Sequence, residues 1–151
     1  MIRATLQGEP IDIGHVLAEA QGEGGGAIAS FTGIVRGDDG VTALELEHYP
    51  AMTEAVMQSL AEEAAARWSL LAVRIVHRIG RMTPGEPVVA IATVAPHRHA
   101  ALDACAFLID ILKSAVPFWK REWRGQAGRW VEPRQSDDRA LARWREHPVE
   151  D

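Results

Sequence analysis

Two lysines, Lys113 and Lys120, stand on either side of a Pro-Phe-Trp sequence. The segment around them, residues 113–145, holds nine of the sixteen lysines and arginines but only four of the twenty-one acidic residues. The segment therefore carries a net charge of +5 in a chain whose net charge is −5. Aromatic side chains beside cations in an otherwise acidic protein indicate a focused anion site rather than a general polyanion-binding surface.

The spacing of the two lysines suggests a specific chemistry. Lys113 falls in the last turn of a predicted helix, where a cation is favourable for structural reasons alone. Lys120 shares one face of the next predicted strand with Phe118 and Glu122, so we expect it to be partly desolvated. If the two ammonium groups met at about 6 Å, they would repel by about 3 kcal/mol at an effective dielectric constant near 20. Such repulsion favours either an anion bound between them or the loss of a proton from one of them.

Three further candidate anion-binding residues come earlier in the chain. His97 and Arg98 follow a strongly apolar strand and begin a helix, where unpaired first-turn amides favour anions. Arg36 follows another apolar strand beside a glycine-containing loop. A solvated helix start and a surface charge are the ordinary alternatives. His97 and His99 have no partner at ligand spacing, so the sequence predicts no metal site.

Length and composition place these residues in one globular domain. A chain of 151 residues, 47% hydrophobic and 25% charged, is of ordinary domain size. The single cysteine, Cys105, lies in an apolar helical pattern and is expected to be a buried hydrophobe rather than a nucleophile. We see no signal peptide and no apolar run of the ~18 residues that a membrane span needs, so we expect a cytoplasmic protein with no membrane association.

Hydrophobic periodicity predicts alternating strands and helices. Predicted strands cover residues 2–6, 27–35 with a break at Gly33, 42–49, 71–79, 87–95, 118–123 and 129–132, with a hairpin turn at 125–128. Predicted helices cover residues 10–20 with Asp12 as N-cap, 50–68, 98–113 and 136–144. Neighbouring strands look hairpin-like, which favours an α+β fold with a largely antiparallel sheet and flanking helices over a doubly wound parallel fold.

Taken in order, several short motifs resemble the large, catalytic subunit of molybdopterin synthase. The ordered set, at nearly constant spacing, is specific even though each motif alone is weak. The resemblance covers about residues 27–144 of a single domain, 1–151, whose first 26 residues match poorly. The motifs are Phe31-Thr32-Gly33-x-Val35-Arg36, Leu46-Glu47-His48-Tyr49-Pro50-x-Met52, His77-Arg78-Ile79-Gly80, Pro84-Gly85, His97-Arg98, Lys113, Pro117-Phe118-Trp119-Lys120-Arg121-Glu122 and Arg129-Trp130-Val131-Glu132.

The resemblance implies an α/β-hammerhead fold and a homodimer that binds a small ubiquitin-like subunit at each outer end, giving a heterotetramer. The small subunit would carry sulfur as a C-terminal Gly-Gly thiocarboxylate. The implied reaction inserts two sulfurs into cyclic pyranopterin monophosphate and gives the dithiolene of molybdopterin, with no cofactor bound. Because this chain ends Val-Glu-Asp, we expect the sulfur carrier to be a separate chain.

The resemblance also assigns residues. The family's pocket lysines fall on Lys113 and Lys120, the expected catalytic residues. Lys120 would anchor or polarise the thiocarboxylate, and Lys113 would assist acyl transfer or proton movement. Arg134 matches a basic position expected to reach the neighbouring subunit's pocket. The expected substrate-binding residues are Ile34, Val35, Arg36, His97, Arg98, Lys113, Lys120, Arg121, Glu122 and Arg134.

Two other classes of function stay open at this point. An RNA-binding module would use the basic, tryptophan-bearing segment 113–145, but the net charge of −5 argues against a nucleic-acid partner. A subunit that keeps only a scaffolding role is the other alternative. The presence of both Lys113 and Lys120 argues against that role, and the activity that the resemblance implies is that of a sulfurtransferase.

Overall fold

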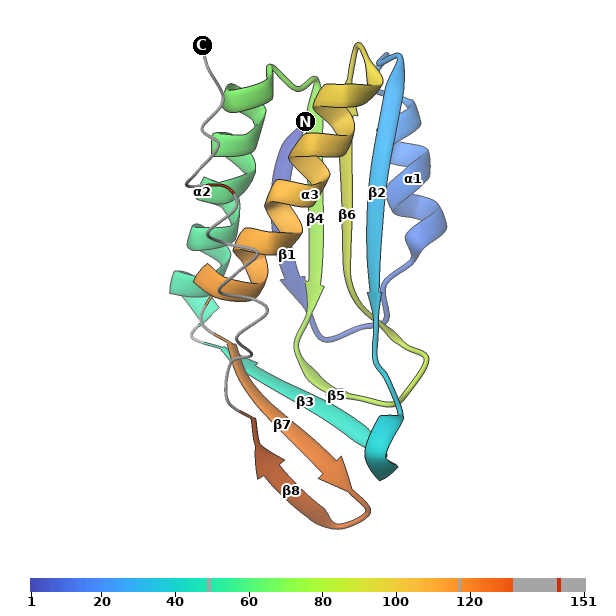
Figure 1. The fold of residues 1–151 in the computed structure, drawn as a ribbon, viewed down its shortest axis with the longest axis vertical. Helices are drawn as coiled ribbons and strands as arrows, with labels where there is room; N and C mark the ends of the chain where they lie inside the picture. Colours follow the sequence, from blue (N-terminus) through green and yellow to red (C-terminus); the bar gives the residue numbers. More distant parts are fainter. Residues whose placement is uncertain (49, 117, 132–143, 145–151) are drawn as a thin grey trace.

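The strands of the computed structural model form two four-stranded sheets (Figure 1). The structure describes residues 1–48, 50–116, 118–131 and 144. The first sheet has the order β1-β4-β6-β2, formed by β1 (Ile2–Gln7), β4 (Ala72–Arg78), β6 (Pro87–Ala95) and β2 (Ala27–Ile34). In it β1 and β4 run parallel, and the other pairs are antiparallel. We call this sheet A.

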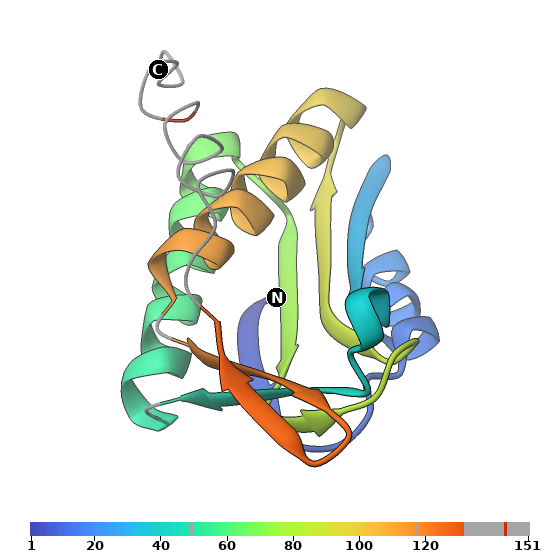
Figure 2. The ribbon, with the colours of Figure 1, turned by 60° about the horizontal axis from the view of Figure 1, so that its bottom comes forward.

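The second sheet, sheet B, is antiparallel throughout and crosses the lower end of sheet A (Figure 2). Its order is β5-β3-β7-β8, formed by β5 (Gly80–Met82), β3 (Ala43–His48), β7 (Phe118–Arg124) and β8 (Ala127–Trp130). The expected α+β class and largely antiparallel pairing are confirmed. The sequence did not indicate that the strands divide between two sheets, and it did not predict β5.

Helices cover both faces of sheet A. α2 (Pro50–Trp68) and α3 (Arg98–Ala115) pack on one face, and α1 (Ile13–Gln21) packs on the other (Figure 1). The predicted N-cap of α1 is confirmed, because Asp12 Oδ1 accepts a hydrogen bond from the His15 backbone N–H at 3.0 Å. Capping in this way satisfies one of the unpaired amides of the first turn.

Burial on both faces explains the continuous apolar strands of sheet A. In β4, Val73 and Ile75 join the core beneath α2 and α3, whereas Ala72 and Val76 join the core beneath α1. Every residue of β4 is buried. β6 alternates in the same way and lies inside the sheet, as its apolar sequence predicted.

A third apolar cluster joins the two sheets. It contains Val35, Leu46 and Met82, and Phe118 packs against it. The strand leading to Val35 changes register between Gly33 and Ile34, which confirms the predicted break. A Cβ atom on Gly33 would lie 2.9 Å from Val89 Cγ1, so glycine permits the close approach of β2 to β6 there.

The C-terminal helix predicted for residues 136–144 lies outside the described residues, apart from Trp144. That side chain packs edge-on against Trp68 and Phe107, and its indole N–H donates to Asp110 Oδ2 at 2.7 Å. Trp144 therefore contacts the helical layer formed by α2 and α3.

Candidate active site

Two segments with predicted site residues pack together where sheet A joins sheet B, and the helix that carries Lys113 leads into one of them. β2 ends at Ile34 and continues through Val35 to Arg36, α3 ends shortly after Lys113, and β7 carries Lys120. Val35 is buried, whereas the side chains on both sides of it are exposed. The third apolar cluster lies at this junction, because Val35 belongs to it and Phe118, at the start of β7, packs against it.

Alternation along β7 separates its side chains into two sets. Phe118 faces the apolar cluster, and Lys120 and Glu122 share its side of the strand at two-residue spacing. The register places Lys120 opposite Leu46, which belongs to the same cluster. Lys120 is half-buried, in agreement with the expectation that it would be partly desolvated. Lys113, in the last turn of α3, is exposed.

The outer face of sheet B holds Arg121 on the side opposite Lys120. Its guanidinium lies 4.1 Å from the ring centroid of Trp130 and 5.4 Å from that of Trp123. Glu45 approaches it at 3.9 Å and also accepts a hydrogen bond from the Trp123 indole at 3.1 Å. These contacts engage Arg121 away from the lysine's face, so the structure does not bring these two predicted site residues together. Sequence alternation predicted the separate faces but not the tryptophan partner in β8.

His77 links the two sheets beside Lys120. Its imidazole stacks on the Phe118 ring, with ring centroids 4.2 Å apart and an interplanar angle of 21°. His77 Nδ1 lies 2.8 Å from the backbone oxygen of Arg78, and because a carbonyl oxygen only accepts, Nδ1 carries the proton. His77 stands in one of the quoted motifs, but no role was predicted for it.

Arg36 follows the buried Val35 and projects outward. Its Nε lies 3.5 Å from Asp38 Oδ2, and both side chains are largely exposed. Exposed pairs of this kind contribute at most about 1 kcal/mol. An anionic ligand can therefore exchange with Asp38 at little cost.

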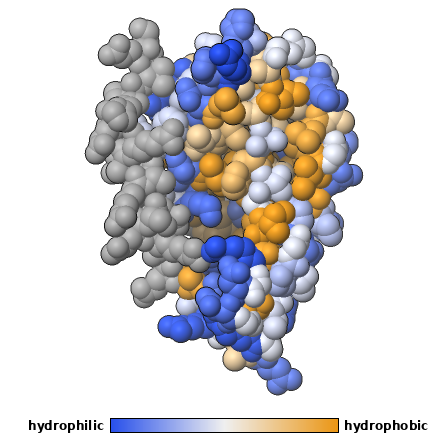
Figure 3. All heavy atoms as spheres, turned by 45° about the vertical axis from the view of Figure 1, so that its right-hand side comes forward, coloured by the Kyte–Doolittle hydropathy of each residue, from blue (hydrophilic) through white to orange (hydrophobic). Residues whose placement is uncertain are grey.

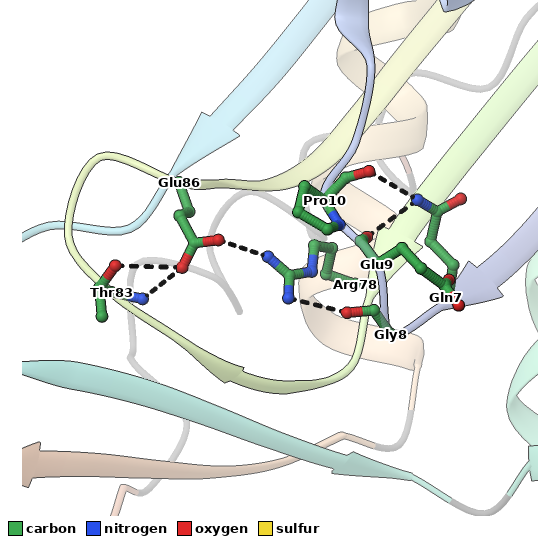
Figure 4. A network of polar contacts seen from close by, with 7 residues as sticks. All are labelled: Gln7, Gly8, Glu9, Pro10, Arg78, Thr83 and Glu86. Atoms are coloured by element: carbon green, nitrogen blue, oxygen red, sulfur yellow. Dashed lines mark hydrogen bonds and ion pairs between the residues drawn. The ribbon is translucent and has the colours of Figure 1, made fainter.

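A buried arginine organises the loop next to Val35 (Figure 4). Arg78 Nη1 lies 2.8 Å from Glu86 Oε1, and Nη2 donates to the Gly8 carbonyl at 2.8 Å. The other oxygen of Glu86 accepts from the backbone N–H and the hydroxyl of Thr83, at 2.6 and 3.1 Å. The Thr83 backbone N–H, followed by the Arg78 hydrogen bond, lowers the pKa of Glu86 below the usual glutamate value. Arg78 stands in one of the quoted motifs, but no local pattern predicted this network, because its partners come from two other parts of the chain.

Comparison with known proteins identifies the family. A family model described as MoaE protein matches residues 6–115. The chain belongs to the MoaE family. It is 45% identical over 149 residues to the molybdopterin synthase catalytic subunit of Cereibacter sphaeroides, covering 95% of this chain and 100% of that protein. It is 50% identical over 130 residues to the subunit of the same name from Pseudomonas aeruginosa, covering 84% and 87%.

Solved structures agree with this assignment to the MoaE family. The molybdopterin cofactor biosynthesis protein E of Burkholderia multivorans superposes with a TM-score of 0.82 at 43% identity. The match covers 95% of this chain and 97% of that one. The resemblance inferred from the ordered motifs is therefore confirmed, together with the fold.

Two of the predicted site residues of this MoaE-family chain lie far from the sheet junction. His97 is the N-cap of α3 but makes no capping hydrogen bond with its side chain, and Arg98 begins the helix; both are exposed. Lys113 follows fifteen residues later in the same helix, which corresponds to about 22 Å along the axis. Figure 1 shows the two ends of α3 at opposite ends of sheet A. Within one copy, the structure does not bring His97 and Arg98 to the lysines. Arg134 lies outside the described residues.

Cys105 is buried in α3, as the apolar pattern predicted. Burial raises the pKa of its thiol to about 11, because the charged thiolate loses its hydration. Across the described residues no group of three or more histidine, cysteine, aspartate or glutamate side chains could hold a metal ion. In the same part of the chain, every helix is too short or too polar to cross a membrane.

Proposed function

We propose that this chain is the catalytic subunit of molybdopterin synthase. It transfers sulfur from the C-terminal thiocarboxylate of a small ubiquitin-like subunit to cyclic pyranopterin monophosphate, and the product is molybdopterin. The observation that carries the proposal is the placement of Lys113 and Lys120. In a MoaE-family chain Lys113 lies in the last turn of α3 and Lys120 lies near the start of β7, the next element, opposite Leu46 of the apolar cluster that joins the sheets.

Both reactants are anions, and the junction offers cations to each. We assign Lys120, half-buried beside Phe118, to the thiocarboxylate, where its charge offsets negative charge that develops on the acyl oxygen. Lys113, exposed at the end of α3, assists acyl transfer or proton movement. Arg36 binds the phosphate from the end of β2. Holding both reactants in one place removes much of the entropic cost of their meeting.

Each transfer exchanges sulfur for oxygen. The thiocarboxylate sulfur forms a bond to a substrate carbon while a carbon–oxygen bond of that carbon breaks, and the leaving oxygen takes the electron pair and picks up a proton. The result is a thioester between the small subunit and the substrate. Water then attacks the acyl carbon, the acyl–sulfur bond breaks, and the small subunit leaves as a carboxylate. The sulfur stays on the substrate, and two such transfers supply the dithiolene. The enzyme's own thiol is not required, in keeping with the burial of Cys105.

A second copy of the chain completes this site. β2 is an edge strand of sheet A, and apolar side chains gather on the surface beside it (Figure 3). Its Ile28 and Ile34 are exposed, as is Leu102 of α3. An unpaired edge with exposed apolar residues is suited to pairing with an identical edge.

Twofold antiparallel pairing of two β2 strands places the start of one strand beside the end of the other. Ala27 at the start pairs with Ala95, two residues before His97, and Ile34 at the end leads to Arg36. The pairing therefore carries His97 and Arg98 of one copy toward Arg36 of the other. We assign His97 and Arg98 to the substrate phosphate and pterin in the neighbouring copy's site, and Arg134 to the same shared pocket.

The proposed assembly is a cytoplasmic heterotetramer of two such chains and two small subunits, without nucleic acid or membrane. Reconstitution tests it. Purified protein, the thiocarboxylated small subunit and cyclic pyranopterin monophosphate should give a pterin with two added sulfurs by mass spectrometry. Omitting the thiocarboxylate sulfur, by using the carboxylate form of the small subunit, should give none. No product from proteins that bind each other would refute the proposal.

A further inference from the structure

The strand end that carries Arg36 is held by the loop before β6. The backbone N–H of Val35 donates to the carbonyl of Glu86 at 2.9 Å, and the N–H of Gly85 donates back to the Val35 carbonyl at 2.9 Å. Arg36 is the next residue, and its side chain is exposed. The position of Arg36 therefore depends on where the backbone of residues 85 and 86 lies.

That loop is fixed from within the protein. Arg78, whose side chain is 6% exposed, joins Glu86 to the Gly8 carbonyl at the end of β1. Glu86 in turn holds Thr83 through two hydrogen bonds to one oxygen. Figure 4 shows this connected series running from Gly8 through Arg78 to Glu86 and Thr83. The loop also contains Gly85 at φ +95, a backbone conformation that other residues rarely adopt.

A turn does not need a buried guanidinium to form. Burying the Arg78 guanidinium carries a desolvation cost, which its ion pair with Glu86, a side chain that is 33% exposed, has to offset. Arg78 Nε also has no hydrogen-bond partner among the described residues, which adds to that cost. What the pair supplies is directional geometry, because a guanidinium and a carboxylate hold each other at fixed angles.

We propose that Arg78 and Glu86 are positioning residues for substrate binding: they hold residues 83–86, and through Val35 they hold Arg36 where the substrate phosphate binds. Neither residue touches the substrate. The inference rests on the proposed function of Arg36. A misplacement of about 1 Å can reduce activity on the order of a hundredfold. Arg78 and Glu86, which we call the clamp, therefore affect the reaction without contacting the substrate.

The test uses full-length Glu86→Gln in the reconstituted complex. The amide cannot accept hydrogen bonds through both of its terminal atoms, so either Arg78 or Thr83 loses its partner. We expect hydrogen exchange at the Val35 and Gly85 amides to rise by about tenfold, as expected for local opening. We expect KM for cyclic pyranopterin monophosphate to rise by about tenfold with little change in kcat.

Gln58→Ala is the matched control. Gln58 anchors α2 to β1, because its side chain accepts from the Ala4 N–H at 2.8 Å and donates to the Ile2 carbonyl at 2.9 Å. Gln58→Ala therefore loosens β1, the strand that leads to Gly8, and leaves the hydrogen bonds of Val35 in place. Its KM and the exchange at Val35 should match the wild type. Thr83→Val, which removes one hydrogen bond to Glu86, gives a milder second variant with changes of the same sign.

Faster exchange at Val35 with a raised KM in Glu86→Gln supports the proposal. Unchanged exchange at Val35, or faster exchange with an unchanged KM, overturns it. A KM raised equally by Gln58→Ala also overturns it, because general loosening would then explain the effect. If the wild type gives no product, the proposed function fails, and the exchange measurement still decides whether the clamp exists.

Discussion

The imidazole of His77 stacks on the ring of Phe118, with centroids 4.2 Å apart. His77 belongs to β4 of sheet A, and Phe118 begins β7 of sheet B, two residues before Lys120. The stack therefore connects the two sheets beside a proposed catalytic lysine. Because both rings pack into a limited space, it restricts how β7 can move relative to the core.

Replacing His77 by alanine should affect both stability and turnover. We expect a loss of about 2 kcal/mol in the free energy of unfolding, because an aromatic pair and buried area are lost together. Turnover should fall by about tenfold, because Lys120 loses its fixed position. Urea unfolding and the reconstituted assay measure the two effects.

His77→Phe is the control for that substitution. Phenylalanine keeps the stack but removes the hydrogen bond to the Arg78 carbonyl, at a cost of about 1 kcal/mol. Its turnover should stay near the wild-type value. Equal turnover in His77→Ala and the wild type would show that the stack does not position Lys120.

The Glu86 carboxylate should make stability depend on pH in the acid range. Its pKa is lowered in the folded protein, by the Thr83 backbone N–H first and by Arg78 second. A carboxyl group with a lowered folded pKa stabilises the protein above its unfolded pKa, about 4.3, and this contribution disappears as the pH falls further. Thermal melts at pH 7, 5, 4 and 3.5 should show a shallower acid decline in Glu86→Gln than in the wild type. Parallel declines would contradict the assignment.

Cys105 should be inert at neutral pH. With a thiol pKa of about 11, the thiolate fraction at pH 7 is on the order of one in ten thousand. A thiol-specific reagent should label the native protein slowly and the urea-unfolded protein quickly. Cys105→Ala should cost about 1 kcal/mol of stability and keep full turnover. Rapid native labelling together with loss of turnover would give the thiol a role that the structure does not support.

A site shared between two copies should show complementation. Lys120→Ala and Arg98→Ala should each be inactive or nearly so as homodimers. When the two variants are mixed, refolded and paired at random, about a quarter of wild-type turnover should return, because half the dimers then carry one intact site of two. Failure to recover activity in verified mixed dimers would place Arg98 in the site of its own copy or outside it.

Local patterns in the sequence predicted much of this fold. The apolar run in β6 required burial on both faces and so an internal strand, and Asp12 had the side chain for an N-cap. β5 was missed because it has three residues and no period of its own. Its pairing with residues 44–46 of β3 defines it. The division into two sheets likewise depends on the pairing of β3 with β7, about 75 residues apart in the chain.

Part of the candidate site could also be predicted from local patterns in the sequence. Alternation placed Lys120 on the face of Phe118, and the structure agrees. The position of Arg121 between two tryptophans could not be predicted, because Trp130 reaches it from another strand. The helix predicted over residues 98–113, which runs to Ala115 in the structure, already separated Arg98 from Lys113. The position of β2 at the edge of sheet A, among the described residues, suggests how a second copy resolves that separation.

The most direct test of the account compares Lys120→Ala with Arg81→Ala in the reconstituted synthase. Arg81 is the control, because its guanidinium lies on the outer face of sheet B, 4.7 Å from the Trp123 ring centroid. Its replacement by alanine also removes one positive charge, but at a position outside the proposed site. We predict that Lys120→Ala binds the thiocarboxylated small subunit but forms no dithiolene pterin, while Arg81→Ala keeps most of its activity. Wild-type turnover in a folded Lys120→Ala protein would contradict the central claim.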